Sequence, residues 1–299
     1  MDYLIQLTDV VVSYPAEDGG EKSVLENIDL RIRPREFVSL VGPTGCGKST
    51  VLRLLLGSQF PTSGTVLFDG RPVRHIDRHR GIVFQKYGLF PHLSVLDNIT
   101  FGPELEQLNL WNRIFKYATQ KYWQVVREQR ELARDLITRI GLAPGDCEKF
   151  PFELSGGMRQ RVAIAQSLIM RPRLLMMDEA FGALDESTRE EMQLLLLEEW
   201  EKNDMTVIFV THNVAEALFL GTRVIGLSQH WEDEDGRPAK GARIVVDAES
   251  GGKHPKPTSY KYSPEFNALL QKIREDVLDP TQRTRLCEFN LSHRDALRD

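Results

Sequence analysis

Long apolar stretches are missing from this 299-residue sequence. A membrane-spanning helix needs about 18 or more consecutive apolar residues, and the longest runs, such as residues 51–56, end far short of that length. The first four residues also lack the basic segment followed by an apolar segment that characterises a secretory signal. We therefore expect a cytoplasmic chain that reaches a membrane only through a partner.

Cysteine and excess positive charge are scarce as well. The three cysteines, Cys46, Cys147 and Cys287, are far apart and show no Cys-x-x-Cys spacing, which argues against a disulfide framework and against a zinc site. The net charge of -5 and the pI near 5.9 argue against binding of nucleic acid by bulk electrostatic attraction. With 41% hydrophobic and 27% charged residues, the chain has the composition of a soluble protein with one or two domains.

Three short apolar segments have the pattern of buried parallel strands, because each is followed by a turn or a polar group and then by a helical pattern. They are residues 37–41, 174–177 and 207–210. Segments in which apolar and polar residues alternate predict antiparallel strands beside this core. They are residues 5–13, 24–32 and 65–68. The predicted fold class is therefore α/β with flanking antiparallel strands.

A largely helical stretch, residues 91–154, interrupts the alternation of strands and helices and predicts a helical subdomain inserted into the α/β core. We expect three parts: an α/β core at residues 1–90 and 159–230, the helical subdomain at 91–158, and a C-terminal extension at 231–299. Within the extension we expect a loop at 232–236, a strand at 243–247 and a helix at 264–277.

Within the helical stretch, apolar residues recur at spacings of three and four, which match one face of a helix. They are Trp111, Phe115, Ala118, Tyr122 and Val125. The simpler interpretation is packing within the subdomain. The alternative is an added contact with another subunit.

A phosphate-binding loop is predicted between the strand at residues 37–41 and the helical run that begins at Thr50. The loop consists of Gly42, Pro43, Thr44, Gly45, Cys46, Gly47, Lys48 and Ser49, which match G-x-x-x-x-G-K-[ST], and we assign the next residue, Thr50, to the same nucleotide site. Backbone N–H groups would face the phosphates of ATP, Lys48 would reach the β- and γ-phosphates, and Ser49 would ligate Mg²⁺. A Gly-rich turn without a ligand is the alternative, which the flanking strand and helix disfavour. A bulky adduct on Cys46 should crowd the phosphates and block ATP binding.

Polar side chains follow the other two predicted buried strands. Asp178 and Glu179 would stand at the carboxyl end of one strand, where ligands of open α/β sheets bind, and His212 follows the next. We assign Asp178 to Mg²⁺ and Glu179 to the attacking water as general base, while His212 can contact the γ-phosphate. Without the phosphate loop, the acidic pair would be interpreted as a solvated turn and the histidine as structural.

A second Gly-containing turn, LSGGM at residues 154–158, precedes the helical segment at residues 162–170. It would expose another group of N–H donors at a helix N-terminus. This turn resembles the signature motif of ABC ATPases. In that family two subunits pair head to tail, so the resemblance implies that Ser155, Gly156 and Gly157 cap the γ-phosphate of ATP held by the other subunit.

Other motifs of the family are present in the same order. Tyr14 occupies the place of the adenine-stacking aromatic residue, Gln85 follows the strand at residues 81–84 as the glutamine of the Q-loop, and Asp185 ends the D-loop sequence ALD. The resemblance implies that Gln85 also acts in hydrolysis and at Mg²⁺. Strand-end tyrosines are common, so the alternative for Tyr14 is a purely structural role.

The resemblance covers about residues 4–228. Its most diagnostic text, DEAFGALD at residues 178–185 together with Met158, is similar to the ATPase subunits of nitrate, sulfonate and taurine importers. Ala180 and Met158 depart from the commoner Pro and Gln, and we expect activity to survive because neither touches the phosphates directly.

The resemblance implies the ABC ATPase fold with a P-loop (RecA-like) core, and ATP and Mg²⁺ as ligands. It implies as partners a second ATPase subunit, identical or closely related, membrane-spanning permease subunits and, indirectly, a solute-binding protein, but no nucleic acid. The chain would lie on the cytoplasmic face of the cell membrane. The absence of a fused membrane domain favours an importer, and the transported solute is left open.

Two other function classes remain as alternatives. A non-transport ABC ATPase would act as an interaction or remodelling protein on ribosomes or DNA. Ribosomal members usually carry two cassettes and DNA-repair members insert a long coiled coil, whereas this chain has one copy of each motif and a shorter helical stretch. A phosphate-loop kinase or GTPase would have no reason to contain the LSGG turn.

Overall fold

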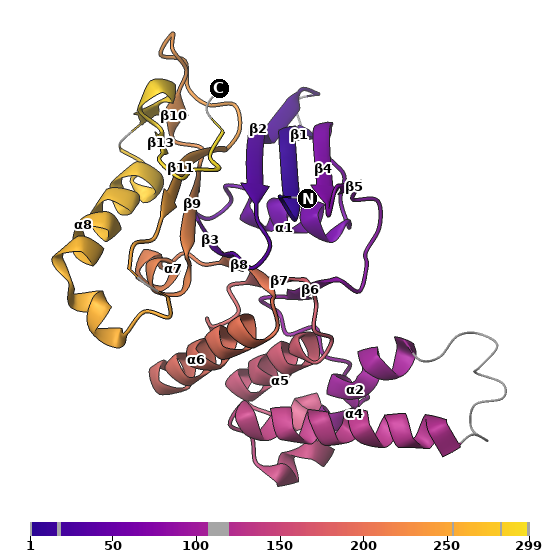
Figure 1. Cartoon of the computed structure of the whole chain (residues 1–299). Coiled ribbons are helices and arrows are strands. Elements are labelled where there is room, and N and C mark those ends of the chain that lie inside the picture. The colour runs from indigo at the N-terminus through magenta and orange to yellow at the C-terminus, as the bar shows by residue number, and fades with distance from the viewer. Residues whose placement is uncertain (1, 17–18, 107–119, 253, 282, 298–299) are drawn as a thin grey trace.

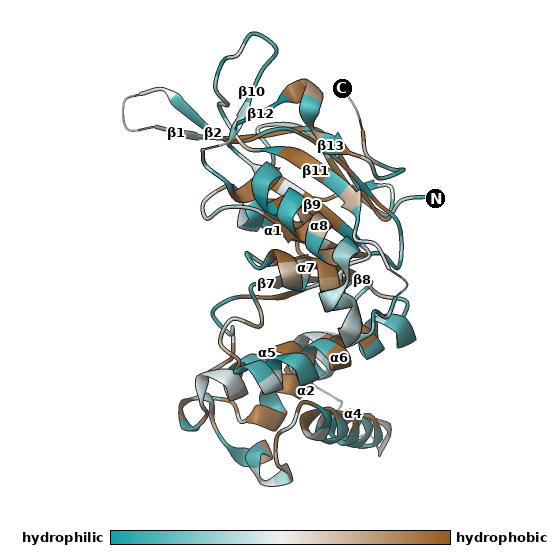
Figure 2. Cartoon of the chain, turned by 90° about the vertical axis from the view of Figure 1, so that its left-hand side faces the viewer, coloured by the Kyte–Doolittle hydropathy of each residue, from teal (hydrophilic) through white to brown (hydrophobic). Residues whose placement is uncertain are grey.

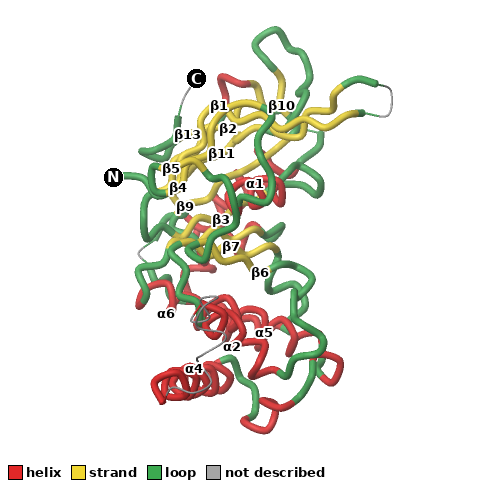
Figure 3. Tube along the Cα trace, turned by 90° about the vertical axis from the view of Figure 1, so that its right-hand side faces the viewer, coloured by secondary structure: helices red, strands yellow, loops and turns green. Residues whose placement is uncertain are grey.

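The computed structural model describes residues 2–16, 19–106, 120–252, 254–281 and 283–297. The chain forms two lobes (Figure 1), one rich in strands and one formed by helices. Figure 3 shows the same division, with the strands of the upper lobe in yellow and the helices of the lower lobe in red. Both ends of the described chain lie on the strand-rich lobe. The helical lobe is therefore formed by the middle of the chain, and the chain returns from it to the strand-rich lobe.

A seven-stranded sheet forms the centre of the strand-rich lobe, in the order β13-β11-β9-β3-β8-β7-β6. Its run of parallel strands consists of β3 (Phe37–Val41), β6 (Arg80–Val83), β7 (Leu174–Asp178), β8 (Thr206–Val210) and β9 (Arg223–Ser228). The three strands predicted from apolar runs are the adjacent strands β3, β8 and β7, which confirms them.

The two faces of this sheet enter different hydrophobic clusters. Alternate residues of β3 belong to the cluster that includes α6 (Glu186–Lys202) and α7 (Val214–Leu220), and to the cluster that includes α1 (Lys48–Leu56). All five residues of β3 are buried, as expected for a strand with helices on both faces. Helices cover both faces of the central sheet, and its strands are correspondingly apolar, as the brown colour in Figure 2 indicates.

A second sheet, of four antiparallel strands, lies over α1 in the order β2-β1-β4-β5. Its strands are β1 (Ile5–Pro15), β2 (Glu21–Ile32), β4 (Ser63–Phe68) and β5 (Arg71–Pro72). The three predicted antiparallel strands are thus confirmed. Because α1 shares one hydrophobic cluster with both sheets, it is held between them.

The helical lobe contains α2 (Val95–Glu106), α4 (Gln120–Arg139) and α5 (Gly156–Leu168), which pack against one another. The described part of the predicted helical stretch, residues 91–106 and 120–154, is confirmed as largely helical. The expected boundary at residue 158 falls inside α5, which also packs on β6, and the division into three parts stays a prediction. Among the helices of the described residues, none combines the length and the apolar character that a membrane crossing requires.

The predicted apolar stripe lies only partly within the described residues. Trp111, Phe115 and Ala118 lie outside the described residues, whereas Val125 belongs to α4. Its two interpretations, packing within the subdomain and contact with another subunit, stay predictions.

The C-terminal extension adds strands and a helix to the core. β11 (Arg243–Glu249) pairs antiparallel with β9, and β13 (Asn290–Leu291) pairs parallel with β11. α8 (Pro264–Ile273) buries its apolar side chains in the same cluster as α6 and α7. The predicted strand and helix of the extension are confirmed, and a short pair of strands, β10 (Trp231–Glu232) and β12 (Thr284–Arg285), completes it.

An ion-pair network fastens the C-terminal segment to the N-terminal sheet. Arg33 donates to both carboxylate oxygens of Asp295, at 2.6 and 2.7 Å, and the Tyr3 hydroxyl donates to the same carboxylate at 3.0 Å. The hydrogen bonds from Arg33 lower the pKa of Asp295 to about 2. Since Tyr3 precedes β1 and Arg33 follows β2, the segment is tied to the ends of both strands.

Candidate functional site

The predicted phosphate loop connects β3 to α1 at the carboxyl edge of the central sheet. Gly47 adopts a φ of 101°, in the left-handed region, and a Cβ placed there would lie 2.7 Å from the Leu25 side chain. A Cβ on Gly42 would lie 2.3 Å from the carbonyl oxygen of Leu227. Both positions therefore require glycine, and the tight loop can present backbone N–H groups to an anion at the N-terminus of α1.

Lys48 is the first residue of α1 and is 7% exposed. Its Nζ donates to the carbonyl oxygens of Gly42 and Pro43, at 2.8 and 2.9 Å. Both acceptors are neutral, so the ammonium charge stays available to a phosphate. Lys48 thus lies across its own loop, where it can neutralise a bound phosphate.

Ser49 and Asp178 meet where α1 begins and β7 ends. The Ser49 hydroxyl donates to Oδ2 of Asp178 at 2.8 Å. A hydroxyl and a carboxylate are oxygen ligands of the kind that Mg²⁺ selects, and Mg²⁺ in such sites takes its remaining ligands from phosphates and water. The donor set beside Lys48 therefore fits Mg²⁺ together with a nucleotide.

Glu179 lies next to this pair in an uncommon backbone conformation, with a φ of 50°. Its N–H donates to the carbonyl oxygen of Val210 at 3.0 Å. Nε2 of Gln85 donates to Oε2 of Glu179 at 2.9 Å, and Nδ1 of His212 lies 3.5 Å from Oε1. The three residues predicted to act in catalysis thus meet at one carboxylate, held by a backbone conformation that is often found at functional sites.

These side chains line one cavity of about 540 Å³. The lining residues are Val24, Thr44, Gly45, Gly47, Lys48, Ser49, Thr50, Gln85, Asp178, Glu179 and His212. A volume of this size suits a ligand as large as a nucleotide. Val24, on β2, is the lining residue that the sequence patterns did not indicate, because its approach to the loop depends on how the two sheets stack.

The signature turn and the D-loop do not line this cavity in the single chain. The Ser155 hydroxyl accepts a hydrogen bond from the N–H of Met158 at 3.2 Å and so begins α5, with Gly156 and Gly157 in its first turn. Asp185 begins α6 in the same way, and the hydrogen bonds from Thr188 and Ser187 lower its pKa to about 2. Both segments are therefore helix N-termini outside the cavity around Lys48.

Tyr14 and Cys46 also stand apart from the cavity lining. Tyr14 lies near the end of β1, is 40% exposed, and its hydroxyl accepts a hydrogen bond from Nε2 of Gln59 at 2.7 Å. Cys46 is 1% exposed, packs in the cluster that includes α1, and burial raises the pKa of its thiol. Alkylation of Cys46 therefore requires the loop to open, so the expected block of ATP binding would develop slowly.

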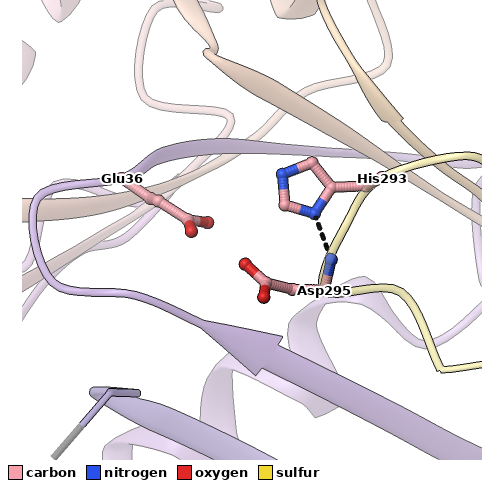
Figure 4. Close-up of side chains that lie close together, drawn as sticks. All are labelled: Glu36, His293 and Asp295. Carbon is pink, nitrogen blue, oxygen red and sulfur yellow. Dashed lines mark hydrogen bonds between the residues drawn. The ribbon is translucent and has the colours of Figure 1, made fainter.

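A separate group of side chains that could ligate a metal lies beside the Arg33–Asp295 pair. Glu36, His293 and Asp295 face one another there (Figure 4). Nδ1 of His293 accepts the N–H of Asp295 at 3.2 Å, which leaves the ring proton of a neutral imidazole on Nε2. Glu36 accepts a hydrogen bond from Arg223 at 3.2 Å, and Asp295 is paired with Arg33. Two guanidinium groups beside the carboxylates disfavour a cation, so this group is an ion-pair network.

Comparison with known families matches residues 25–182 to the family described as ABC transporter. An uncharacterised ABC transporter ATP-binding protein of Methanocaldococcus jannaschii is 39% identical over 262 residues, which cover 87% of this chain and 88% of that protein. A taurine import ATP-binding protein of Chromobacterium violaceum is 38% identical over 90% of this chain and 93% of its own. A nitrate import ATP-binding protein of a Synechocystis species is 38% identical over 84% of this chain and 90% of its own.

The solved structures that are similar to this chain are also ABC transporter cassettes. The dimeric structure of a bacterial ABC transporter cassette has a TM-score of 0.67 and 29% sequence identity, and the match covers 83% of this chain and 100% of that one. A dimeric post-hydrolysis state of an ATP-binding cassette bound to ADP and Pi has a TM-score of 0.65 with the same identity and coverage, 29%, 83% and 100%. The family match spans the phosphate loop, the signature turn and the Asp178–Glu179 pair.

Proposed function

The chain is an ATPase of the ABC transporter family, and we propose that its ATP hydrolysis energises the uptake of a small anion through membrane-spanning permease subunits. One observation carries the proposal: Lys48, the Ser49–Asp178 pair and Glu179 line a single cavity of about 540 Å³. This arrangement combines a cation for phosphates, oxygen ligands for Mg²⁺ and a carboxylate for water.

Within one subunit, we assign the phosphates to Lys48 and the loop N–H groups. Ser49, Asp178 and Gln85 would hold Mg²⁺, which when bound neutralises charge on the phosphates. Glu179 would accept a proton from the attacking water, and His212 would donate to the γ-phosphate from the same edge of the sheet. The position of Glu179 between Gln85 and His212 supports this division of roles.

We propose that the signature turn acts on ATP bound by a second subunit. Ser155, Gly156 and Gly157 lie outside the cavity of their own chain, yet the N-terminus of α5 offers N–H donors and positive potential to an anion. The similar cassette structures are dimers. In a head-to-tail pair, Tyr14 would stack on adenine and Asp185 would lie near the same interface.

An apolar groove of about 300 Å³ offers a docking place for a permease subunit. It lies between β6 with the Q-loop and α5, and its apolar lining includes Phe84, Tyr87, Phe90 and Met170. A groove of this kind suits a short amphipathic helix. Because Phe84 immediately precedes Gln85, a change at the Glu179 carboxylate would reach the docked helix through the Q-loop.

The transported solute is proposed from the relatives. Taurine and nitrate import proteins are 38% identical to the chain over most of its length. We propose a small anion or sulfonate, delivered by a solute-binding protein, and a place for the chain on the cytoplasmic face of the cell membrane. The alternative of a non-transport remodelling ATPase has less support, because these relatives are import proteins.

Reconstitution with the membrane subunits tests this function. The chain would be purified with the permease in lipid vesicles, and ATP hydrolysis would be measured with taurine, an alkanesulfonate or nitrate and the solute-binding protein. One of these solutes should stimulate hydrolysis. The same solute should accumulate on the side of the vesicle membrane that carries the ATPase subunit. Failure of the chain to associate with any membrane protein would instead favour the remodelling alternative.

A further inference from the structure

Tyr87 joins the Q-loop to the signature turn within one chain. It follows Gln85 by two positions, and its ring lies against the start of α5. The guanidinium carbon of Arg159 is 5.1 Å from the centre of the Tyr87 ring, within the range of a cation–π interaction. A Cβ placed on Gly156 would lie 3.0 Å from the Tyr87 hydroxyl oxygen. Tyr87 therefore contacts the N-terminal end of α5 at two residues, Gly156 and Arg159.

Arg159 donates hydrogen bonds to the carbonyl oxygen of Ser155 and to carbonyl oxygens of the residues that precede it. Its Nη1 donates to the carbonyl oxygen of Leu154 at 2.8 Å and to that of Pro151 at 3.3 Å. Its backbone N–H donates to the carbonyl oxygen of Ser155 at 3.0 Å. The pair formed by Tyr87 and Arg159 thus holds the turn that precedes α5 and the first turn of the helix as one unit.

The Tyr87 ring is placed by a tight turn of the Q-loop. Tyr87 has a φ of 22° and Gly88 a φ of 69°. A positive φ is uncommon for a residue other than glycine and persists where the surroundings hold it. Here the surroundings are the large hydrophobic cluster, against which the partly buried Tyr87 side chain packs. The turn therefore orients the Tyr87 ring towards the start of α5, two residues after Gln85.

We propose that Tyr87 is a positioning residue that couples the two nucleotide sites of the dimer. It links Gln85, which contacts the Glu179 carboxylate of one site, to Ser155 and Gly156, which cap the ATP of the other. A change at Glu179 would move the Q-loop, and the signature turn would move with it. This inference rests on the proposed head-to-tail dimer, and it assigns to Tyr87 no contact with ATP.

The test uses the full chain carrying Glu179→Gln as the parent, so that ATP-bound dimers accumulate. Dimer formation is followed by light scattering during an ATP titration, and the affinity for MgADP is measured separately as a property of the single cavity. Tyr87→Leu should raise the ATP concentration for half-maximal dimer formation at least fivefold and leave the MgADP affinity unchanged. Arg159→Gln should give the same shift. Tyr87→Phe keeps the ring and should behave like the parent.

Tyr262→Leu is the matched control, because Tyr262 is 81% exposed in the C-terminal extension. Dimer formation by Tyr87→Leu at the parent's ATP concentration would overturn the coupling role. A parallel loss of MgADP affinity would also overturn it, since Tyr87 would then act on its own cavity. If the Glu179→Gln parent forms no dimer with ATP, the proposed function fails, and the role of Tyr87 fails with it.

Discussion

Nε2 of Gln85 donates a hydrogen bond to Oε2 of Glu179 at 2.9 Å, across the gap between the Q-loop and the end of β7. The amide engages one oxygen of the carboxylate, while Nδ1 of His212 lies 3.5 Å from the other. Glu179 is therefore held by a residue that also begins the link to α5. This hydrogen bond connects the proposed general base directly to the Q-loop.

Glu179→Gln should bind MgATP normally and lose hydrolysis by about 100-fold or more, because the amide cannot accept a proton from the attacking water. Steady-state phosphate release and nucleotide affinity are the measurements. Glu186→Gln is the control, since its side chain is 76% exposed in a surface ion pair on α6. A Glu179→Gln variant that hydrolyses ATP at the wild-type rate would show that another group is the base.

Ser49→Ala should raise the Mg²⁺ concentration for half-maximal hydrolysis by about 10-fold or more, because it removes one oxygen of the Ser49–Asp178 pair. Hydrolysis is measured over a Mg²⁺ titration at fixed ATP. Ser58→Ala, beyond the other end of α1, serves as control because Ser58 is exposed. An unchanged Mg²⁺ dependence of Ser49→Ala would argue against Ser49 as a ligand.

The Arg33–Asp295 pair should make stability fall in acid. The folded-state pKa of Asp295 is about 2 instead of its ordinary 3.8. The stabilisation is therefore fully present above pH 3.8 and is lost as the pH falls from 3.8 towards 2. Its expected size is on the order of 1 kcal/mol, reduced by the partial exposure of Arg33.

Denaturant unfolding of wild type and Asp295→Asn between pH 2.5 and 7, roughly the range set by the linkage argument, measures this contribution. The two curves should differ near neutral pH and converge in acid. Asp235→Asn is the control, because Asp235 forms an exposed surface pair. A constant difference across the range would mean that Asp295 acts by packing alone.

Lys256 should be essential for docking of the C-terminal extension. It is 4% exposed, and the carbonyl oxygens of Leu218, Gly221 and Ser250 and the Ser250 hydroxyl all lie within hydrogen-bonding distance of its Nζ. Lys256→Met keeps most of the side-chain volume but removes the buried donor of these acceptors, among which the Gly221 carbonyl oxygen keeps the Ser250 hydroxyl as donor. The variant should therefore destabilise the protein by about 2 to 4 kcal/mol.

Chemical unfolding measures the loss at Lys256. Lys272→Met is the matched control, since Lys272 is exposed on α8. If the two variants unfold at the same denaturant concentration, the buried amine contributes no net stability. The expected result would show that Lys256 contributes strongly to the contact between the extension and the C-terminal end of α7.

Several features were predictable because their causes are local. Glycines at fixed spacing before Lys48 indicated a phosphate loop, and the apolar run at residues 37–41 indicated a buried strand. Ser155 before two glycines carried a further local signal, since a serine at that place caps a helix. The helical pattern at residues 162–170 placed the helix start too late, and α5 begins at Gly156. Apolar spacing does not report a first turn made of glycines.

Other features needed the folded chain. Cys46 belongs to the phosphate loop by sequence, yet its side chain packs beneath the loop in the cluster around α1. Val24 reaches the cavity from another sheet, and Tyr87 reaches α5 across the groove. No spacing in the sequence encodes these contacts, because they depend on the stacking of elements that are distant in the chain.

The sequence by itself determined the inventory: a phosphate loop, strands with polar residues at their carboxyl ends, and a second helix N-terminus at Ser155. These follow from backbone sterics and from periodic burial, which act over a few residues. Only the tertiary structure decided which parts share a site. The order β3-β8-β7 brings Ser49 within 2.8 Å of Asp178, 129 positions later, and leaves Ser155 outside their cavity. The physical reason is that strand order depends on packing between elements that are distant in the sequence, which no local pattern encodes.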